Sequence, residues 1–234
     1  METAELSIPI EHARLEAVGA LLDTPAEDTG RSAVLLAHGA GADMASGFLA
    51  RFAADLAERG FPVLRFNYAY SERAAREGTR KPPDRRTALL AVHRSAVAAA
   101  RERFGERPLV LAGKSMGGRM ASLLAAEGEQ CAGLAFLGYP LHPPGRKLKL
   151  RTGHWPSIAA PALFLQGTRD ALCDLEILGA ELPSLGGSTT LRVIEDADHD
   201  FRVTRRGGRA REEVFGELAG AFVEWEEGLG TGES

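Results

Sequence analysis

Residues 108–118 read Pro-Leu-Val-Leu-Ala-Gly-Lys-Ser-Met-Gly-Gly, an apolar run that leads directly into a turn of small residues. The apolar run predicts a buried strand, and a helix is predicted to begin near Met116. A serine held between a strand and a helix needs a very tight turn. Glycines at 113 and 117 leave room for that turn, because larger side chains would collide with it. The stretch therefore predicts an exposed serine, Ser115, at the end of a buried strand.

Five further apolar runs of similar length alternate with segments of helical period. They cover residues 32–37, 62–67, 133–138, 162–166 and 189–194. Such continuous apolar runs are typical of parallel strands that are buried on both faces and joined by helices. Two more runs, 6–10 and 15–22, are predicted to add an antiparallel pair at one edge. The expected fold is α/β, with a mostly parallel central sheet of six to eight strands flanked by helices.

Apolar stripes predict the helices that pack on this sheet. Phe48, Phe52 and Leu56, for example, share one helical face. Asp84, which follows two prolines, is the predicted N-cap of a long helix. The proline-rich segment 139–161 between two strands is too short for another helical unit, so we expect no large cap domain.

The composition fits one domain. The chain has 234 residues, of which 44% are hydrophobic and 26% charged, enough to bury a sizeable core. Without a linker or repeat, we predict a single domain over 1–234, with its core at about 32–225 and a frayed end at 228–234. No apolar run approaches the ~20 residues that cross a bilayer, and the start of the chain does not resemble a secretion signal. We therefore expect a cytoplasmic protein without membrane contact.

The two cysteines, Cys131 and Cys173, stand alone in the sequence, far from each other and from any histidine pair. This spacing argues against a disulfide scaffold and against a structural zinc site. We expect both thiols to be reduced and buried. No other pattern in the chain predicts a metal or a cofactor, and the oligomeric state is left open.

A serine hydroxyl is a weak nucleophile unless a base removes its proton, so Ser115 requires a histidine and an acid later in the chain. Asp170 follows the apolar run 162–166, and His199 lies in the turn after the run 189–194. Open α/β sheets place their sites at the carboxyl ends of such strands. We therefore predict that Ser115, Asp170 and His199 form a catalytic triad.

These segments have competing interpretations. Asp196, Asp198 and Asp200 are rival acids, but they lie so close to His199 in the sequence that we interpret them as turn formers. The tripeptide Gly-Lys-Ser at 113–115 also resembles the end of a phosphate-binding loop. That loop requires a glycine five positions before its last glycine, where this chain has proline.

The negative oxygen of a tetrahedral intermediate needs preorganised donors, usually two backbone N–H groups. We predict the N–H groups of Met116 and Ala40 for this oxyanion hole, Ala40 being part of the small-residue loop after the run 32–37. Gly41 beside it is a candidate substrate contact. His38, at the start of the loop, is expected to brace it by hydrogen bonding.

With these residues in place, the sequence resembles the α/β-hydrolase superfamily. The blocks that carry the resemblance are residues 38–42, 113–118, 137–144, 166–170 and 196–201. The chain is similar to the small, cap-less dienelactone-hydrolase-like branch. Within that branch it resembles the group of testis-expressed protein 30 and a hydrolase-like subunit of the non-specific-lethal histone acetyltransferase complex. The resemblance implies an α/β-hydrolase fold and a Ser, His, Asp triad, but no substrate, and the group includes subunits of complexes.

The sequence thus predicts a serine hydrolase that cleaves a carboxylic ester, lactone or thioester through an acyl-enzyme on Ser115. A non-catalytic interaction protein of the same fold and an acyltransferase with the same triad are the alternatives. Tyr139, His142 and His154 lie in the loop expected to overhang Ser115 and are candidate substrate contacts. Bracing of that loop is an equally good interpretation of the two histidines.

Charge adds an expectation about the substrate. The net charge of -4 provides no global attraction to nucleic acid. Three segments, 71–86, 141–160 and 199–211, nevertheless hold more basic than acidic residues, and each follows the carboxyl end of a strand. The pattern predicts a positive rim around Ser115 that attracts a small, anionic, ester-like molecule.

Overall fold

The structure is a computed structural model that describes residues 1–12, 14–204 and 208–229. In this part of the chain, eight strands form one sheet in the order β1-β2-β4-β3-β5-β6-β7-β8. The strands are β1 (Glu2–His12), β2 (Leu15–Thr24), β3 (Ala33–Ala37), β4 (Val63–Phe66), β5 (Leu109–Lys114), β6 (Gly133–Leu137), β7 (Ala162–Gly167) and β8 (Thr189–Ile194). From β4 to β8 all neighbours pair in parallel. The predicted mostly parallel sheet is confirmed.

The predicted antiparallel pair at one edge is also confirmed, and it is longer than expected. β1 pairs with β2, and β2 pairs antiparallel with β4, so the hairpin extends the sheet. At the other edge, β8 is only partly buried, with Val193 42% exposed. β8 lies at the edge of the sheet, and the expectation of burial on both faces was wrong for this strand.

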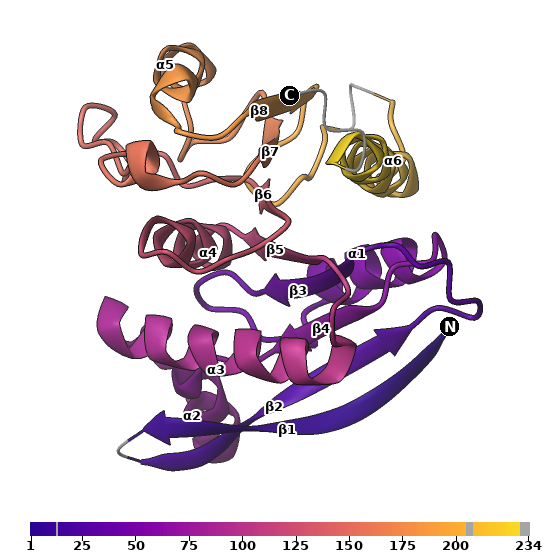
Figure 1. The fold of residues 1–234 in the computed structure, drawn as a ribbon. Coiled ribbons are helices and arrows are strands. Elements are labelled where there is room, and N and C mark those ends of the chain that lie inside the picture. The colour runs from indigo at the N-terminus through magenta and orange to yellow at the C-terminus, as the bar shows by residue number, and fades with distance from the viewer. Residues whose placement is uncertain (13, 205–207, 230–234) are drawn as a thin grey trace.

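Helices cover both faces of the sheet (Figure 1). They are α1 (Gly47–Ala57), α2 (Ala69–Glu77), α3 (Arg86–Phe104), α4 (Met116–Ala126), α5 (Leu175–Glu181) and α6 (Arg211–Leu229). In Figure 1 the sheet is seen nearly edge-on, with α1 and α6 on one face and α2 to α5 on the other. Each face has its own apolar core: Phe52 of α1 and Phe222 of α6 belong to one, and Leu124 of α4 to the other.

The start of α3 differs from the prediction. Arg85, not Asp84, occupies the N-cap position, and no side chain caps the helix. The Asp84 carboxylate instead accepts a hydrogen bond of 2.6 Å from Nη2 of Arg73 in α2. A charged partner outcompetes the helix N–H groups for this carboxylate.

The segment between β6 and β7 contains only one short 3-10 helix, η1 (Trp155–Ser157), and no cap domain; a second such helix, η2 (Leu182–Ser184), follows α5. Cys131 is half-buried and Cys173 buried, and both are free. Among the described helices none is long and apolar enough to cross a membrane. α6 continues to Leu229, two residues into the segment expected to fray, and the rest of that segment lies outside the described residues.

Candidate active site

Ser115 occupies the sharp turn between β5 and α4. Its backbone has φ 50° and ψ -113°, a conformation that residues with side chains rarely adopt. A Cβ on Gly113 would lie 2.3 Å from the backbone nitrogen of Gly118, and one on Gly117 would lie 2.4 Å from the carbonyl oxygen of Ala37. Glycine at 113 and 117 is therefore required by close backbone approach, as the sequence indicated.

The three residues predicted as a triad lie within hydrogen-bond distance of one another. His199 Nε2 is 2.8 Å from Ser115 Oγ, and His199 Nδ1 is 2.7 Å from Asp170 Oδ2. The Asp170 side chain is fully buried, whereas that of His199 is 24% exposed. A neutral imidazole that donates through Nδ1 to the carboxylate presents the lone pair of Nε2 to the serine hydroxyl. This arrangement can remove a proton from Ser115.

Asp170 is fixed by a side chain of β7 and by the backbone of its own turn. Gln166 Nε2 donates to Asp170 Oδ2 at 2.6 Å, and the backbone N–H of Leu172 donates to Oδ1 at 2.8 Å. Both bonds orient the carboxylate toward His199. Two of the rival acids serve the turn itself: Asp198 Oδ1 accepts from the backbone N–H groups of Asp200 and Arg202, and Asp196 Oδ2 accepts from that of Thr204. The interpretation as a turn former does not hold for the Asp200 carboxylate, which lines the cavity.

The loop after β3 is stabilised by the buried side chain of His38. His38 is completely buried, and its Nδ1 lies 2.8 Å from the carbonyl oxygen of Gly39, while Nε2 accepts from the backbone N–H of Tyr68 at 3.2 Å. Burial lowers the pKa of His38 to about 4, so the ring is neutral at pH 7. The hydroxyl of Tyr70 also donates to the Gly39 carbonyl, at 3.3 Å. The expected bracing role of His38 is confirmed.

The two predicted oxyanion donors flank Ser115. Met116 is the first residue of α4, where a helix leaves its N–H groups without intrahelical partners. Within the described residues, the N–H of Ala40 also has no hydrogen-bond acceptor. Ala40 lines the same cavity as Ser115 and His199. Both N–H groups are thus free to donate to a substrate oxygen.

The triad opens into a cavity of about 480 Å³. A cavity of this size suits a small molecule. The residues that line it come from the loop after β3, the first turn of α1, the turn between β5 and α4, the turns after β7 and β8, and the start of α6: Gly39, Ala40, Ala42, Ser46, Gly47, Phe48, Leu49, Lys114, Ser115, Leu172, His199, Asp200, Arg202 and Arg211.

The four other candidate contacts are absent from this lining. Tyr139 is fully buried, and its hydroxyl accepts from Trp155 Nε1 at 3.2 Å. His142 is 1% exposed, and Nε2 of His154 is 2.7 Å from Ser122 Oγ. Gly41 is exposed, with φ 76°. In this conformation the three side chains brace the segment between β6 and β7.

The three basic segments contribute unequally to the cavity. Only segment 199–211 lines it, through Arg202 and Arg211. In segments 71–86 and 141–160, several cations pair with nearby carboxylates, as Lys147 does with Asp174. Arg205 and Arg206 of the third segment lie outside the described residues. The predicted rim is thus reduced, in the described residues, to one side of the cavity.

Sequence reasoning missed three polar residues at the site. Lys114 ends β5 and Gln166 is the last residue but one of β7, both strands being otherwise apolar, and that break in the pattern was the available signal. Ser46 lies between a loop and a helix and carried no such signal, because serine is common at these positions.

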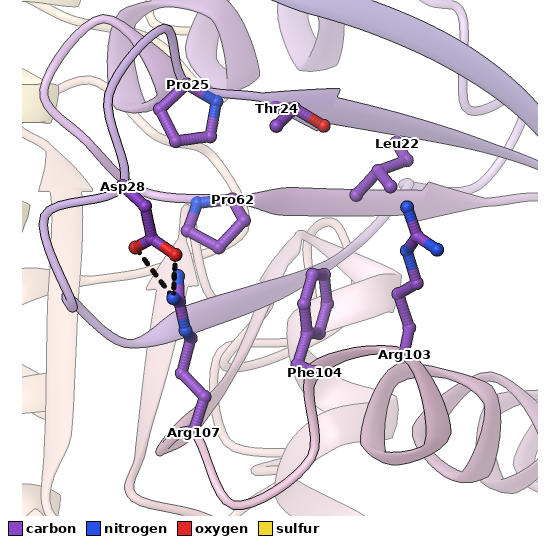
Figure 2. A pocket seen from close by; sticks show the side chains of 8 residues that line it. All are labelled: Leu22, Thr24, Pro25, Asp28, Pro62, Arg103, Phe104 and Arg107. Carbon is purple, nitrogen blue, oxygen red and sulfur yellow. Dashed lines mark hydrogen bonds and ion pairs between the residues drawn. The ribbon is translucent and has the colours of Figure 1, made fainter.

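Another pocket, of about 260 Å³, opens at the opposite edge of the sheet (Figure 2). Pro62 precedes β4 and Arg107 precedes β5, so this edge carries the amino ends of the parallel strands. Both oxygens of Asp28 accept from Arg107 Nη2, at 2.7 and 2.6 Å. The pocket thus has no connection with the triad, which lies at the carboxyl ends.

A parallel sheet with a serine elbow at the carboxyl end of β5 and a histidine and an acid beside it defines the α/β-hydrolase class. The profile of the alpha/beta hydrolase domain family matches residues 30–227. The chain belongs to this family.

Solved structures share the fold over nearly the whole chain. A dienelactone hydrolase from Anabaena variabilis superposes with a TM-score of 0.71 at 20% identity, covering 96% of this chain and 97% of that one. XC6422 from Xanthomonas campestris, described as a serine hydrolase without lid, gives 0.68 at 22% identity, covering 96% and 95%. An alpha-beta serine hydrolase homologue from Coxiella burnetii gives 0.68 at 16%, covering 97% and 95%. These similarities support the dienelactone-hydrolase-like branch at the level of the fold.

Proposed function

We propose that the protein is a serine hydrolase that cleaves a carboxylic ester, lactone or thioester. The observation that carries the proposal is the chain of two hydrogen bonds from Ser115 through His199 to the buried Asp170. The strained backbone of Ser115 adds support, because such strain is retained where function requires the position.

In the proposed reaction, Ser115 Oγ forms a bond to the substrate carbonyl carbon while its proton moves to His199 Nε2. The N–H groups of Ala40 and Met116 stabilise the negative oxygen of the tetrahedral intermediate. The bond to the leaving group then breaks, and the leaving group takes the proton from His199. Asp170 holds the imidazole in the required tautomer and stabilises its positive charge.

Water completes the cycle by attacking the acyl-enzyme. His199 accepts a proton from this water, and the resulting tetrahedral intermediate collapses, returning Oγ of Ser115 with that proton and releasing the acid. The segment between β6 and β7 adds no cap domain over the triad, so water has access. An alcohol in place of water would give the acyltransferase, which uses the same groups.

The first experiment is intact-mass spectrometry after exposure to a fluorophosphonate probe, which reacts with activated serines. The wild type should gain one adduct, and Ser115→Ala and His199→Ala should gain none. Ser188→Ala is the control, because this serine lies before β8, away from the cavity. Folded wild type without an adduct would overturn the proposal and favour the interaction protein, the role found among the complex subunits that the sequence resembles.

Once a substrate that the wild type hydrolyses has been found, Ser115→Ala should lower its kcat by about 10⁴-fold or more. Thioester and oxyester pairs that share an acyl group then define the leaving group. Transfer to an added alcohol, measured beside hydrolysis, separates the acyltransferase from the hydrolase.

A further inference from the structure

The cavity extends beyond the triad to the beginning of α1. Ser46 and the first three residues of the helix line it. Ser46 occupies the N-cap position, but its side chain does not cap the helix, and no acidic residue lies in the first turn. Ser46 Oγ is enclosed and has no hydrogen-bond partner among the described residues. The N–H groups of this turn therefore lack the anionic or polar acceptor that usually satisfies them.

Lys114 lines the same part of the cavity. It is the last residue of β5, its side chain is only 8% exposed, and Nζ lies 5.9 Å from the ring centres of Phe48 and Phe201. The closest carboxylate oxygen, Oδ1 of Asp200, is 4.0 Å away, beyond hydrogen-bond distance. The side chain is thus largely withdrawn from water, and its ammonium has no hydrogen-bond acceptor among the described residues, so it is available to a ligand in the cavity.

Asp200 does not cancel this positive charge. Its side chain is 58% exposed, and its other oxygen lies 3.8 Å from Nη2 of Arg202. The carboxylate is thus shared between two cations, one of them in solvent. Arg211, which also lines the cavity, is exposed, so solvent screens its positive charge. The lining therefore carries more positive than negative charge.

We propose that Ser46, the first turn of α1 and Lys114 form an anion subsite that binds a carboxylate carried by the substrate. This inference rests on the proposed function, because it assigns the substrate class of the same cavity. Lys114 Nζ donates to the carboxylate, and the hydroxyl of Ser46 and the N–H groups at the helix start supply further donors. Lys114 is then a specificity-determining residue.

The charge balance favours a carboxylate over a phosphate. With Asp200 and Arg202 offsetting each other, Lys114 and the helix terminus face the ligand. Together they supply about one and a half positive charges, since a helix terminus is equivalent to roughly half a charge. A carboxylate, with a single charge, stays within this value, whereas a phosphate monoester carries up to two negative charges and exceeds it. The predicted substrate is an ester or thioester of small size with a carboxylate a few bonds from the cleaved bond.

The test uses amides that cannot turn over readily. N-acetyl ω-amino acids with three, four and five methylenes are titrated into the wild type by calorimetry, each beside its neutral primary amide. The variants are Lys114→Met, Lys114→Arg and Ser46→Ala. Lys149→Met is the matched control, because it removes the same charge from an exposed lysine outside the cavity. Thermal unfolding establishes that each variant is folded.

At least one acid should bind about tenfold or more tightly than its amide in the wild type. Lys114→Met should abolish this preference, Ser46→Ala should reduce it, and Lys114→Arg and Lys149→Met should keep it. Equal binding of every acid and its amide, or a preference that survives Lys114→Met, overturns the inference. If Lys114→Met fails to fold, a preference unchanged by Ser46→Ala overturns the subsite.

A second arm separates this inference from the proposed function. The acetate esters of the matching ω-hydroxy acids and of their amides are offered as substrates. If the esters of the acids and of the amides are hydrolysed at equal rates and the acids show no binding preference, the hydrolase is supported and the anion subsite is refuted. If the acids bind preferentially through Lys114 but neither fluorophosphonate labelling nor hydrolysis is observed, the subsite is supported and the proposed catalysis is refuted.

Discussion

Gly113→Ala tests the geometric basis of the elbow. The added methyl group would lie 2.3 Å from the nitrogen of Gly118 and 2.4 Å from the carbonyl carbon of Gly117. Ordinary contacts begin near 3.4 Å, so these backbone atoms must move by roughly 1 Å. Overpacking of this kind costs about 1–3 kcal/mol, and contacts with backbone on two residues place it at the upper end. Alanine regains about 0.5–1 kcal/mol because it is less flexible than glycine, which leaves a net loss of about 2 kcal/mol.

The assay is urea unfolding followed by circular dichroism, with Gly220→Ala as the matched control. Gly220 lies inside α6, where a Cβ would meet nothing within 4 Å. The same substitution there should stabilise the protein by about 0.5–1 kcal/mol, because alanine favours helix. Displacement of the elbow by about 1 Å should also lower kcat by about 100-fold in Gly113→Ala. The reasoning is refuted if Gly113→Ala is as stable as the wild type and retains its activity.

Three further predictions concern buried polar groups. Asp23 and Arg65 form an ion pair of 2.7 Å, and their side chains are only 2% and 5% exposed. Arg65→Met leaves the Asp23 carboxylate buried without its partner, so it should lower the free energy of unfolding in urea by about 3–5 kcal/mol. Adding Asp23→Asn removes the unpaired charge and should recover much of this loss. A double variant no more stable than Arg65→Met would contradict this account. Burial lowers the pKa of His93 from 6.5 to about 3, so the stability it contributes above pH 6.5 is lost as the pH falls toward 3. Between pH 3 and 6.5, His93→Leu should therefore reduce the slope of the unfolding free energy against pH by up to about 1.4 kcal/mol per pH unit. An unchanged slope would contradict this account of His93. Burial raises the pKa of Cys131 to about 11 and that of Cys173 beyond its usual range, so both thiols should react slowly with a disulfide reagent at pH 8 unless urea is added.

Much of the fold could be predicted because most of the central strands are short apolar runs. The run 189–194 coincides with β8, and six others match strands to within two residues at each end. The long hairpin of β1 and β2 was underestimated, since residues 2–5 are exposed and carry no apolar pattern. Asp84 was misassigned because a local capping rule cannot anticipate Arg73, a partner that only the folded chain brings near.

The residues of the candidate site likewise fall into those that the sequence predicted and those that it did not. Ser115, Asp170 and His199 could be selected because their order and their places after strands follow from chemistry and topology. Tyr139 and His142 were selected only because their loop lies near the serine. Which way a loop side chain points depends on packing, and here both point into the core. Ser46 was missed for the same reason, since its loop position gave no sign that its hydroxyl would be enclosed.

Lys114 shows how binding and stability compete in this cavity. Burial lowers its pKa from 10.5 to about 8, although Asp200 acts in the opposite direction. Below pH 8 the charged amine therefore costs the folded state about 3 kcal/mol, and this cost fades as the pH rises from 8 toward 10.5, where the unfolded chain also loses the proton. Lys114→Met should thus raise the free energy of unfolding at pH 7 by about 1–3 kcal/mol, and by less at pH 10. If the variant is instead less stable at pH 7, Lys114 serves the fold through Asp200 and the two phenylalanine rings. A gain in stability together with lost carboxylate binding would mean that the charge is kept for the ligand.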